Sequence, residues 1–149
     1  MKKQKSYAFD KNVYLLGRDE DGRNYWLEEA SWDCDWYWGF GYIESYTNNA
    51  NPSRARDIYS HEHFSSLGYD GFKAKFKETP LNDSEIWQLC ELMRSFYIAR
   101  EYSDMLHRGG SNYSHNPCKD TIKNEDEYKR INEVVIPEIC KAVYKLLEN

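Results

Sequence analysis

Residues 36–46 constrain the fold most, because large aromatic side chains alternate there with small or polar ones. The even-numbered positions are Trp36, Trp38, Phe40, Tyr42, Glu44 and Tyr46, and the odd-numbered positions include Gly39, Gly41, Ile43 and Ser45. Successive side chains of a strand point to opposite faces, so this period of two predicts a β-strand. One face of that strand would be an aromatic stripe. The other, notched at two glycines, would let a ring, a backbone or a ligand approach closely.

Two apolar runs, at residues 13–16 and 25–27, precede this strand and predict two further strands. The polar segment between them contains Asp21-Gly22, which favours a hairpin loop. After the aromatic strand, an asparagine-rich segment with Pro52 ends the pattern, because proline cannot continue a hydrogen-bonded ladder. Residues 54–71 have no clear period and predict a long connection.

The second half of the chain has helical periodicity. Phe72 and Phe76 predict a short amphipathic helix that stops before Pro80. Asn82 or Asp83 would cap a long helix that runs to about residue 106 and buries Ile86, Leu89, Cys90, Met93, Phe96 and Tyr97. A last helix covers residues 128–146, and Pro137 should kink it.

These patterns together predict the α+β class: one domain over residues 1–149, β-rich at 1–60 and helical at 70–149. We expect an antiparallel meander of about three strands, with two long C-terminal helices packed over its aromatic face. The chain has 13 Tyr and 5 Trp, residues that suit half-buried surfaces and interfaces as well as cores.

The formal net charge of −5 at pH 7 argues against nonspecific binding of nucleic acid. Four separated cysteines, Cys34, Cys90, Cys118 and Cys140, form no Cys-x-x-Cys pair and are typical of reduced, mostly buried thiols in a cytosolic protein. The sequence predicts neither a signal peptide nor a membrane span, so we expect a soluble, cytoplasmic protein without a membrane partner.

His61-Glu62-His63 is the most suggestive cluster for chemistry. If this stretch is extended, both imidazoles project to the same side and could share a divalent metal with a third ligand from elsewhere. The pair lacks the fixed spacing of a zinc signature, so a structural or surface role is the alternative, and we predict no bound cofactor.

Arg54, Arg56 and Asp57 lie just upstream of the histidines. The two guanidiniums suit a phosphate or carboxylate, and with the histidines they could form an anion-binding or acid–base site. The alternative is a loop held in place by an Arg–Asp ion pair. A nucleophilic Cys34 is disfavoured, because the flanking Asp33 and Asp35 oppose formation of the thiolate.

The aromatic stripe also has two interpretations. Packed under the helices it is the core face of the sheet. Any exposed part, with Trp36, Trp38 and Tyr42 as candidates, would serve as a stacking platform or an interface anchor.

The run Trp32-Asp33-Cys34-Asp35-Trp36-Tyr37-Trp38-Gly39-Phe40-Gly41-Tyr42, followed by Asn51-Pro52-Ser53, Arg56-Asp57-Ile58 and Ser60-His61-Glu62-His63-Phe64, resembles short proteins of phages and mobile elements from Gram-positive bacteria. No activity is attached to those proteins, so no functional residue is carried over. The resemblance implies a setting in which small proteins block or tune host defence, such as CRISPR or nucleotide signalling.

Two function classes follow. The first is a non-catalytic binding or inhibitory protein that captures a host protein, a ribonucleoprotein or a nucleotide ligand, with candidate binding residues Trp36, Trp38, Tyr42, Arg54, Arg56, His61 and His63. The second is a small metal-dependent or acid–base phosphoesterase or nuclease that uses His61, His63 and Asp57. We favour the first, because no cluster supplies a complete set of nucleophile, base and stabilising donor.

Overall fold

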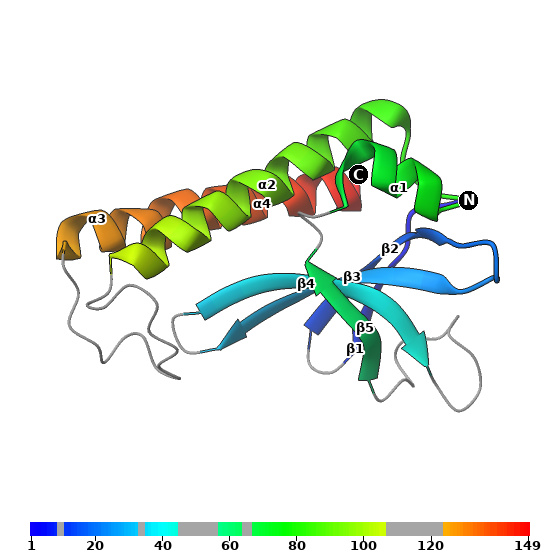
Figure 1. The fold of residues 1–149 in the computed structure, drawn as a ribbon, viewed down its shortest axis with the longest axis horizontal. Helices are drawn as coiled ribbons and strands as arrows, with labels where there is room; N and C mark the ends of the chain where they lie inside the picture. Colours follow the sequence, from blue (N-terminus) through cyan, green and yellow to red (C-terminus); the bar gives the residue numbers. More distant parts are fainter. Residues whose placement is uncertain (9–10, 33–34, 45–56, 64–66, 107–123) are drawn as a thin grey trace.

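A computed structural model describes residues 1–8, 11–32, 35–44, 57–63, 67–106 and 124–149. For residues 7–8, 11, 28–32, 35–40, 43–44 and 57–63 the description covers the backbone alone. Figure 1 shows two layers, an antiparallel sheet and a set of helices that lies across one of its faces. The α+β class predicted from the sequence is confirmed.

Within the described residues the sheet has five strands in the order β1-β2-β3-β4-β5, so each strand pairs with its neighbours in sequence. The strands are β1 (Lys5–Ala8), β2 (Lys11–Arg18), β3 (Asn24–Trp32), β4 (Asp35–Glu44) and β5 (Asp57–His63). The sequence patterns predicted a sheet of about three strands. The additional strands are the two at the edges, where the sequence is polar and lacks a period of two; pairing with β2 and β4 makes them extended.

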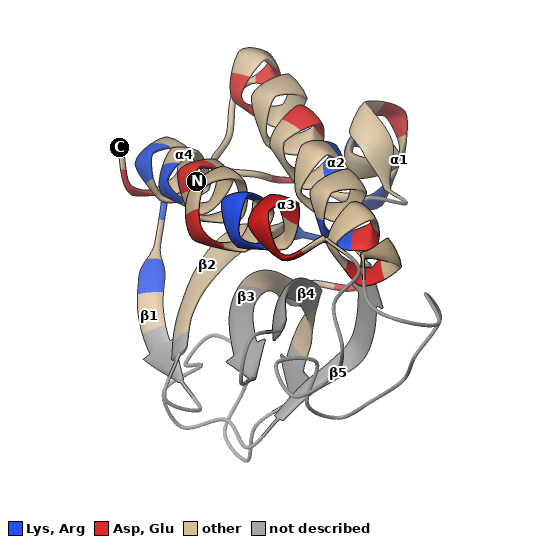
Figure 2. Cartoon of the chain, turned by 90° about the vertical axis from the view of Figure 1, so that its left-hand side faces the viewer, with Lys and Arg blue, Asp and Glu red and all other residues tan. Residues whose placement is uncertain are grey.

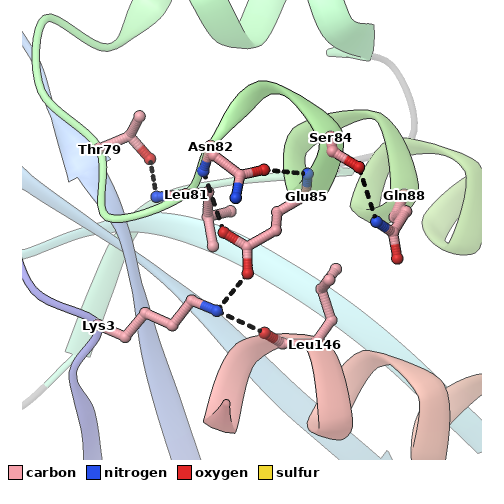
Figure 3. A network of polar contacts seen from close by, with 8 residues as sticks. All are labelled: Lys3, Thr79, Leu81, Asn82, Ser84, Glu85, Gln88 and Leu146. Atoms are coloured by element: carbon pink, nitrogen blue, oxygen red, sulfur yellow. Dashed lines mark hydrogen bonds and ion pairs between the residues drawn. The ribbon is translucent and has the colours of Figure 1, made fainter.

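The helical layer contains the two long helical segments predicted for the C-terminal half. Its elements are α1 (Gly68–Lys75), α2 (Asp83–Met105), α3 (Glu125–Arg130), η4 (Ile131–Val135) and α4 (Ile136–Glu148). The side chain of Asn82 caps α2 as predicted: its Oδ1 accepts from the Glu85 backbone N–H, and Glu85 Oε1 accepts from the Asn82 N–H (Figure 3).

Pro137, where the sequence predicts a kink, directly follows a change of helix type. The turn that precedes it, η4, is π-helical, with a wider i→i+5 hydrogen-bond pattern. Pro137 then occupies the first turn of α4, where a missing backbone donor costs little. The chain therefore accommodates the proline by a change of helix type.

The main core lies between the sheet and the helices. Tyr14, Leu16, Tyr25 and Leu27 come from β2 and β3; Phe72 and Phe76 from α1; Ile86, Leu89, Met93 and Phe96 from α2; and Ile136, Cys140, Val143 and Leu147 from α4. Val13, Leu15 and Trp26, which alternate with the core residues, are also buried. Residues 13–16 of β2 and 25–27 of β3 are thus buried on both faces, which explains why these two apolar runs are continuous.

On the glycine-bearing face of β4, Gly41 lies across the ladder from a tryptophan. Gly41 pairs with Trp26 in the β3–β4 register, and both residues are buried. An aromatic residue across the ladder from a strand glycine covers the backbone that the glycine leaves bare. At this position the glycine accommodates a residue of the same sheet, which is one of the uses predicted from the sequence.

Candidate functional site

The predicted site residues fall into two groups. Arg54 and Arg56 lie outside the described residues. Trp36 and Trp38 are backbone positions of β4, and Asp57, His61 and His63 are backbone positions of β5. The binding role predicted for Trp36, Trp38, Arg54, Arg56, His61 and His63 stays a prediction, and so does the alternative catalytic role of His61, His63 and Asp57.

His61 and His63 lie in strand β5, so their backbone is extended, which the metal-binding hypothesis requires. His61 and His63 are two residues apart in the strand, and His63 pairs with Gly39 of β4. Asp57 pairs with Glu44 at the other end of β5, about 20 Å from His63 along the strand. Among the side chains that the structure describes, which exclude those of β5, no group of three His, Cys, Asp or Glu could hold a metal ion.

Tyr42 is the one predicted binding residue with a described side chain, and it is half-buried. Its ring meets that of Tyr25 edge-on at 5.7 Å, and the Arg23 guanidinium lies 5.1 Å from its centroid. Tyr42 packs against the core that the helices cover. At this position the aromatic stripe has the core role that the sequence allowed as one of its two interpretations.

Two of the four cysteines are described, and both are buried free thiols, as predicted for Cys90 and Cys140. Burial raises the pKa of the Cys90 thiol to about 11, so that thiol is protonated at neutral pH. Cys34 and Cys118 lie outside the described residues.

The outer face of α2 carries large apolar residues that the sequence interpretation did not assign to a surface. Exposed fractions are 53% for Trp87, 57% for Ile98, 46% for Tyr102 and 68% for Met105. We call these four residues the α2 stripe. The Trp87 ring stacks on Tyr69 of α1, with centroids 4.5 Å apart and planes 7° from parallel. Their spacing of 11, 4 and 3 residues was a helical signal, hidden by the stronger buried stripe on the same helix.

The outer face of α4 has a different composition. Its exposed residues within the helix are Glu138, Lys141, Lys145 and Glu148. Charged residues of both signs lie along the helices (Figure 2), but the balance differs between α2 and α4. Helix α2 has five acidic and two basic residues, and α4 has two of each.

A groove of about 610 Å³ runs between α2 and α4. Glu85, Gln88 and Glu91 line one wall, and Lys145 and Leu146 line the other. At one end the Lys3 ammonium forms an ion pair with Glu85 and donates to the Leu146 carbonyl at 3.0 Å (Figure 3). Burial of Glu85 opposes its ionisation, but the Lys3 ammonium and the Asn82 backbone N–H together outweigh that effect and lower the pKa of the carboxyl below its ordinary value.

A second, basic cleft of about 750 Å³ lies where the start of the chain, the end of β2 and the segment between α1 and α2 meet. Its polar lining consists of Lys2, Gln4, Arg18, Lys77, Glu78 and Thr79. Three of these side chains are cationic and one is anionic. No sequence motif joins them, because they come from three segments far apart in the chain.

No helix in the described parts of the chain is both long and apolar enough to cross a membrane. Comparisons of this chain with protein-family models, with curated proteins and with solved structures find no match.

Proposed function

We propose that this chain is a non-catalytic binding protein whose α2 stripe captures a partner protein through an amphipathic, basic helix of that partner. The observation that carries the proposal is the exposure of Trp87, Ile98, Tyr102 and Met105 on one helix that already buries a full apolar stripe on its other side. Exposed apolar patches of this kind mark interaction surfaces more often than isolated exposed residues do.

The geometry of the stripe supports a helical partner. At 100° per residue, Trp87, Ile98 and Met105 lie within about 20° of one another around the helix axis, and they span about 27 Å along it. Between Trp87 and Ile98, Glu91 and Arg94 form an ion pair at 3.8 Å. A helix laid along α2 would meet these anchors at intervals of whole turns, as in helix-in-groove recognition.

The charge of α2 supports a basic partner. Helix α2 has a formal charge of −3, from five acidic and two basic residues, and no basic residue lies in its last turn. The negative end of the helix dipole is at that turn, where Glu101 and Asp104 lie. Lys or Arg beside the partner's apolar residues would complement this field and favour correct encounters.

Trp87 supplies a preorganised anchor. Its ring is stacked on Tyr69 and is still half exposed, so binding would immobilise it at a small cost in side-chain entropy. Tryptophan is also enriched among the residues that dominate binding energy at interfaces.

The resemblance to phage and mobile-element proteins supports a host protein as the partner, including a component of a defence system. The catalytic alternative, a phosphoesterase that uses His61 and His63, has one supporting observation, the extended backbone of β5. The two classes differ in what the purified protein would carry: a second protein chain in one case and stoichiometric metal in the other.

The test compares three forms of the C-terminally tagged protein. Each form is purified from a separate culture of the host cells, and the masses of its complexes are measured by native mass spectrometry. The three forms are the wild type, the triple variant Ile98→Gln/Tyr102→Gln/Met105→Gln, and the control Lys141→Gln/Lys145→Gln on the outer face of α4. We expect one protein at fixed stoichiometry with the wild type and the control, and its absence from the triple variant. Glutamine keeps helix propensity, so the fold should survive.

A partner retained by the triple variant would overturn the α2 stripe as the binding surface. Stoichiometric metal that is lost in the double variant His61→Ala/His63→Ala would instead establish the catalytic alternative.

A further inference from the structure

We infer that the basic cleft is a binding site for a small ligand that bears a diphosphate or a similar multivalent phosphate. This site is separate from the α2 stripe and does not depend on the function proposed above.

The floor of the cleft is a backbone junction. Strand β2 has an irregular register between Leu15 and Gly17, and immediately after it Arg18 bridges to Glu78. The Arg18 N–H donates to the Glu78 carbonyl at 2.8 Å, and the Lys77 N–H donates to the Arg18 carbonyl at 2.8 Å. The Thr79 hydroxyl also donates to the Leu16 carbonyl at 2.7 Å. Irregularities of this kind are frequent beside binding sites, where they redirect a side chain.

Gly17 makes this junction possible. A Cβ at that position would lie 2.7 Å from both the Glu78 carbonyl oxygen and Cγ of Phe76. The bare backbone of Gly17 therefore allows the 76–78 segment to lie directly against β2, which brings Arg18 and Lys77 to one cleft.

A hydrogen bond to Asn24 orients the Arg18 guanidinium. Its Nε donates at 2.9 Å to Oδ1 of Asn24, a polar side chain that is only 6% exposed. Its other contact, from Nη1 to Glu78 Oε2, is long at 3.4 Å and lies between exposed groups. A planar fork held in this way is suited to two oxygens of one phosphate, and a ligand anion would compete well with the weak Glu78 contact.

Lys2 and Lys77 complete the charge. Both ammonium groups are exposed, and neither forms an ion pair with any residue that the structure describes. With Arg18 they give three positive charges against the single carboxylate of Glu78. A net charge of about +2 in a concave site favours a multivalent anion over a monovalent carboxylate.

The size of the cleft and the charge of the chain indicate a small ligand. A volume of about 750 Å³ lies within the usual range for small-molecule and cofactor sites. The chain as a whole carries −5, which opposes the approach of a long polyanion such as RNA.

The experiment titrates the full chain with pyrophosphate, adenosine diphosphate and, as a monovalent comparison, acetate, by calorimetry and by amide chemical shifts. We expect saturable binding of both diphosphates, no binding of acetate, and affinity that falls as NaCl is raised. Equal affinity for the two diphosphates would identify the phosphates alone as the ligand. Tighter binding of the nucleotide would show that its nucleoside also contacts the cleft.

Variants assign the binding to the cleft. We expect Arg18→Gln to weaken pyrophosphate binding about tenfold, because a charged hydrogen bond is lost. The affinity of Arg18→Lys should lie between those of the wild type and Arg18→Gln. Lys2→Gln/Lys77→Gln replaces two exposed side chains and should weaken binding without loss of fold. Glu78→Gln should tighten it, since it removes repulsion and frees the Arg18 fork. Lys141→Gln on α4 is the control and should not change the affinity.

Absence of saturable diphosphate binding in the wild type would overturn the inference. So would an affinity that is the same in the wild type and in the correctly folded Lys2→Gln/Lys77→Gln variant.

Discussion

The helices α2 and α4 contribute to the same core, but they differ on the side that faces away from the sheet. Both bury an apolar stripe against β2 and β3. The outer side of α4 exposes charged residues of both signs, whereas α2 exposes Trp87, Ile98, Tyr102 and Met105 and has a formal charge of −3. Helix α4 thus has the simple amphipathic pattern that folding requires, and α2 has apolar residues beyond that requirement.

The difference separates residues needed for folding from residues available for another purpose. Core positions on both helices gain stability by leaving water on folding. The side chains of the α2 stripe stay about half exposed, so they gain less of this energy in the isolated chain than the core positions do. A partner that covers it would supply the missing burial, and this reasoning underlies the proposed function.

The largest expected effect is on the inner faces, where the two helices should behave alike. Phe96 on α2 and Leu147 on α4 are 0% and 4% exposed. Phe96→Ala should lower the free energy of unfolding by about 3–5 kcal/mol and Leu147→Ala by about 2–5 kcal/mol, because each leaves a cavity. Urea denaturation followed by circular dichroism measures both. A loss below about 1 kcal/mol for either variant would contradict the shared core.

The next effect concerns how the helices begin. Helix α2 starts at the Asn82–Glu85 capping box, whereas α4 starts from the π-helical turn without a side-chain cap. Asn82→Ala should therefore lower the free energy of unfolding by about 1 kcal/mol, and Asn82→Asp, which keeps an acceptor, should restore most of it. Thermal melts of the three proteins provide the measurement. If the alanine variant is as stable as the wild type, packing alone holds the start of α2.

A smaller, pH-dependent effect is expected at the end of α4. The Tyr14 hydroxyl donates to Glu148 Oε2 at 2.8 Å, and this bond, together with Lys5, lowers the pKa of the Glu148 carboxyl below its ordinary value of 4.5. A carboxyl with a lowered folded-state pKa stabilises the fold above pH 4.5, and the contribution disappears as pH falls through the lowered pKa.

Because the Glu148 side chain is 38% exposed and therefore screened by solvent, the contribution should be only a few tenths of a kcal/mol. Glu148→Gln should thus be slightly less stable than the wild type at pH 7, and the difference should shrink as the pH falls below 4.5, as measured by urea denaturation at a series of pH values. A stability difference that stays constant between these pH values would argue against a role for the ionised carboxylate.

The smallest expected effect is on the outer faces. Single replacements Ile98→Gln, Tyr102→Gln and Met105→Gln should each change the free energy of unfolding by less than about 0.5 kcal/mol, as should Lys141→Gln on α4. Differential scanning fluorimetry of the isolated chain can check this. A loss above about 1 kcal/mol at the α2 positions would mean that the stripe contributes to folding and would remove the contrast with α4.

Local patterns predicted much of the fold correctly. The alternation in residues 36–46, the Asn82 cap and the apolar positions of the second half each predicted an element that the structure contains. The edge strands β1 and β5 were not predicted, because an edge strand is stabilised mainly by hydrogen bonds to its neighbour and its own residues need no period. The π-helical turn before Pro137 was not predicted either, because a change of helix type depends on the surrounding packing.

The candidate surfaces were less predictable. The sequence predicted the buried side of α2, but it gave no prediction for Trp87, Ile98, Tyr102 and Met105, because the stronger buried stripe already accounts for an amphipathic helix. The basic cleft depends on Lys2, Arg18 and Lys77, which come close only because Gly17 lets the 76–78 segment lie against β2. Contacts between residues so far apart in the chain leave no local signal.

By itself, the sequence determined the aromatic strand, the capped long helix and the α+β class, because these depend on periodicity and on caps within a few residues of one another. Only the tertiary structure decided that Tyr42 packs against the core, that Trp26 lies opposite Gly41 and that Trp87, Ile98, Tyr102 and Met105 remain in water. The reason is geometric: the sheet and α4 together cover one side of α2, so its second apolar face stays exposed.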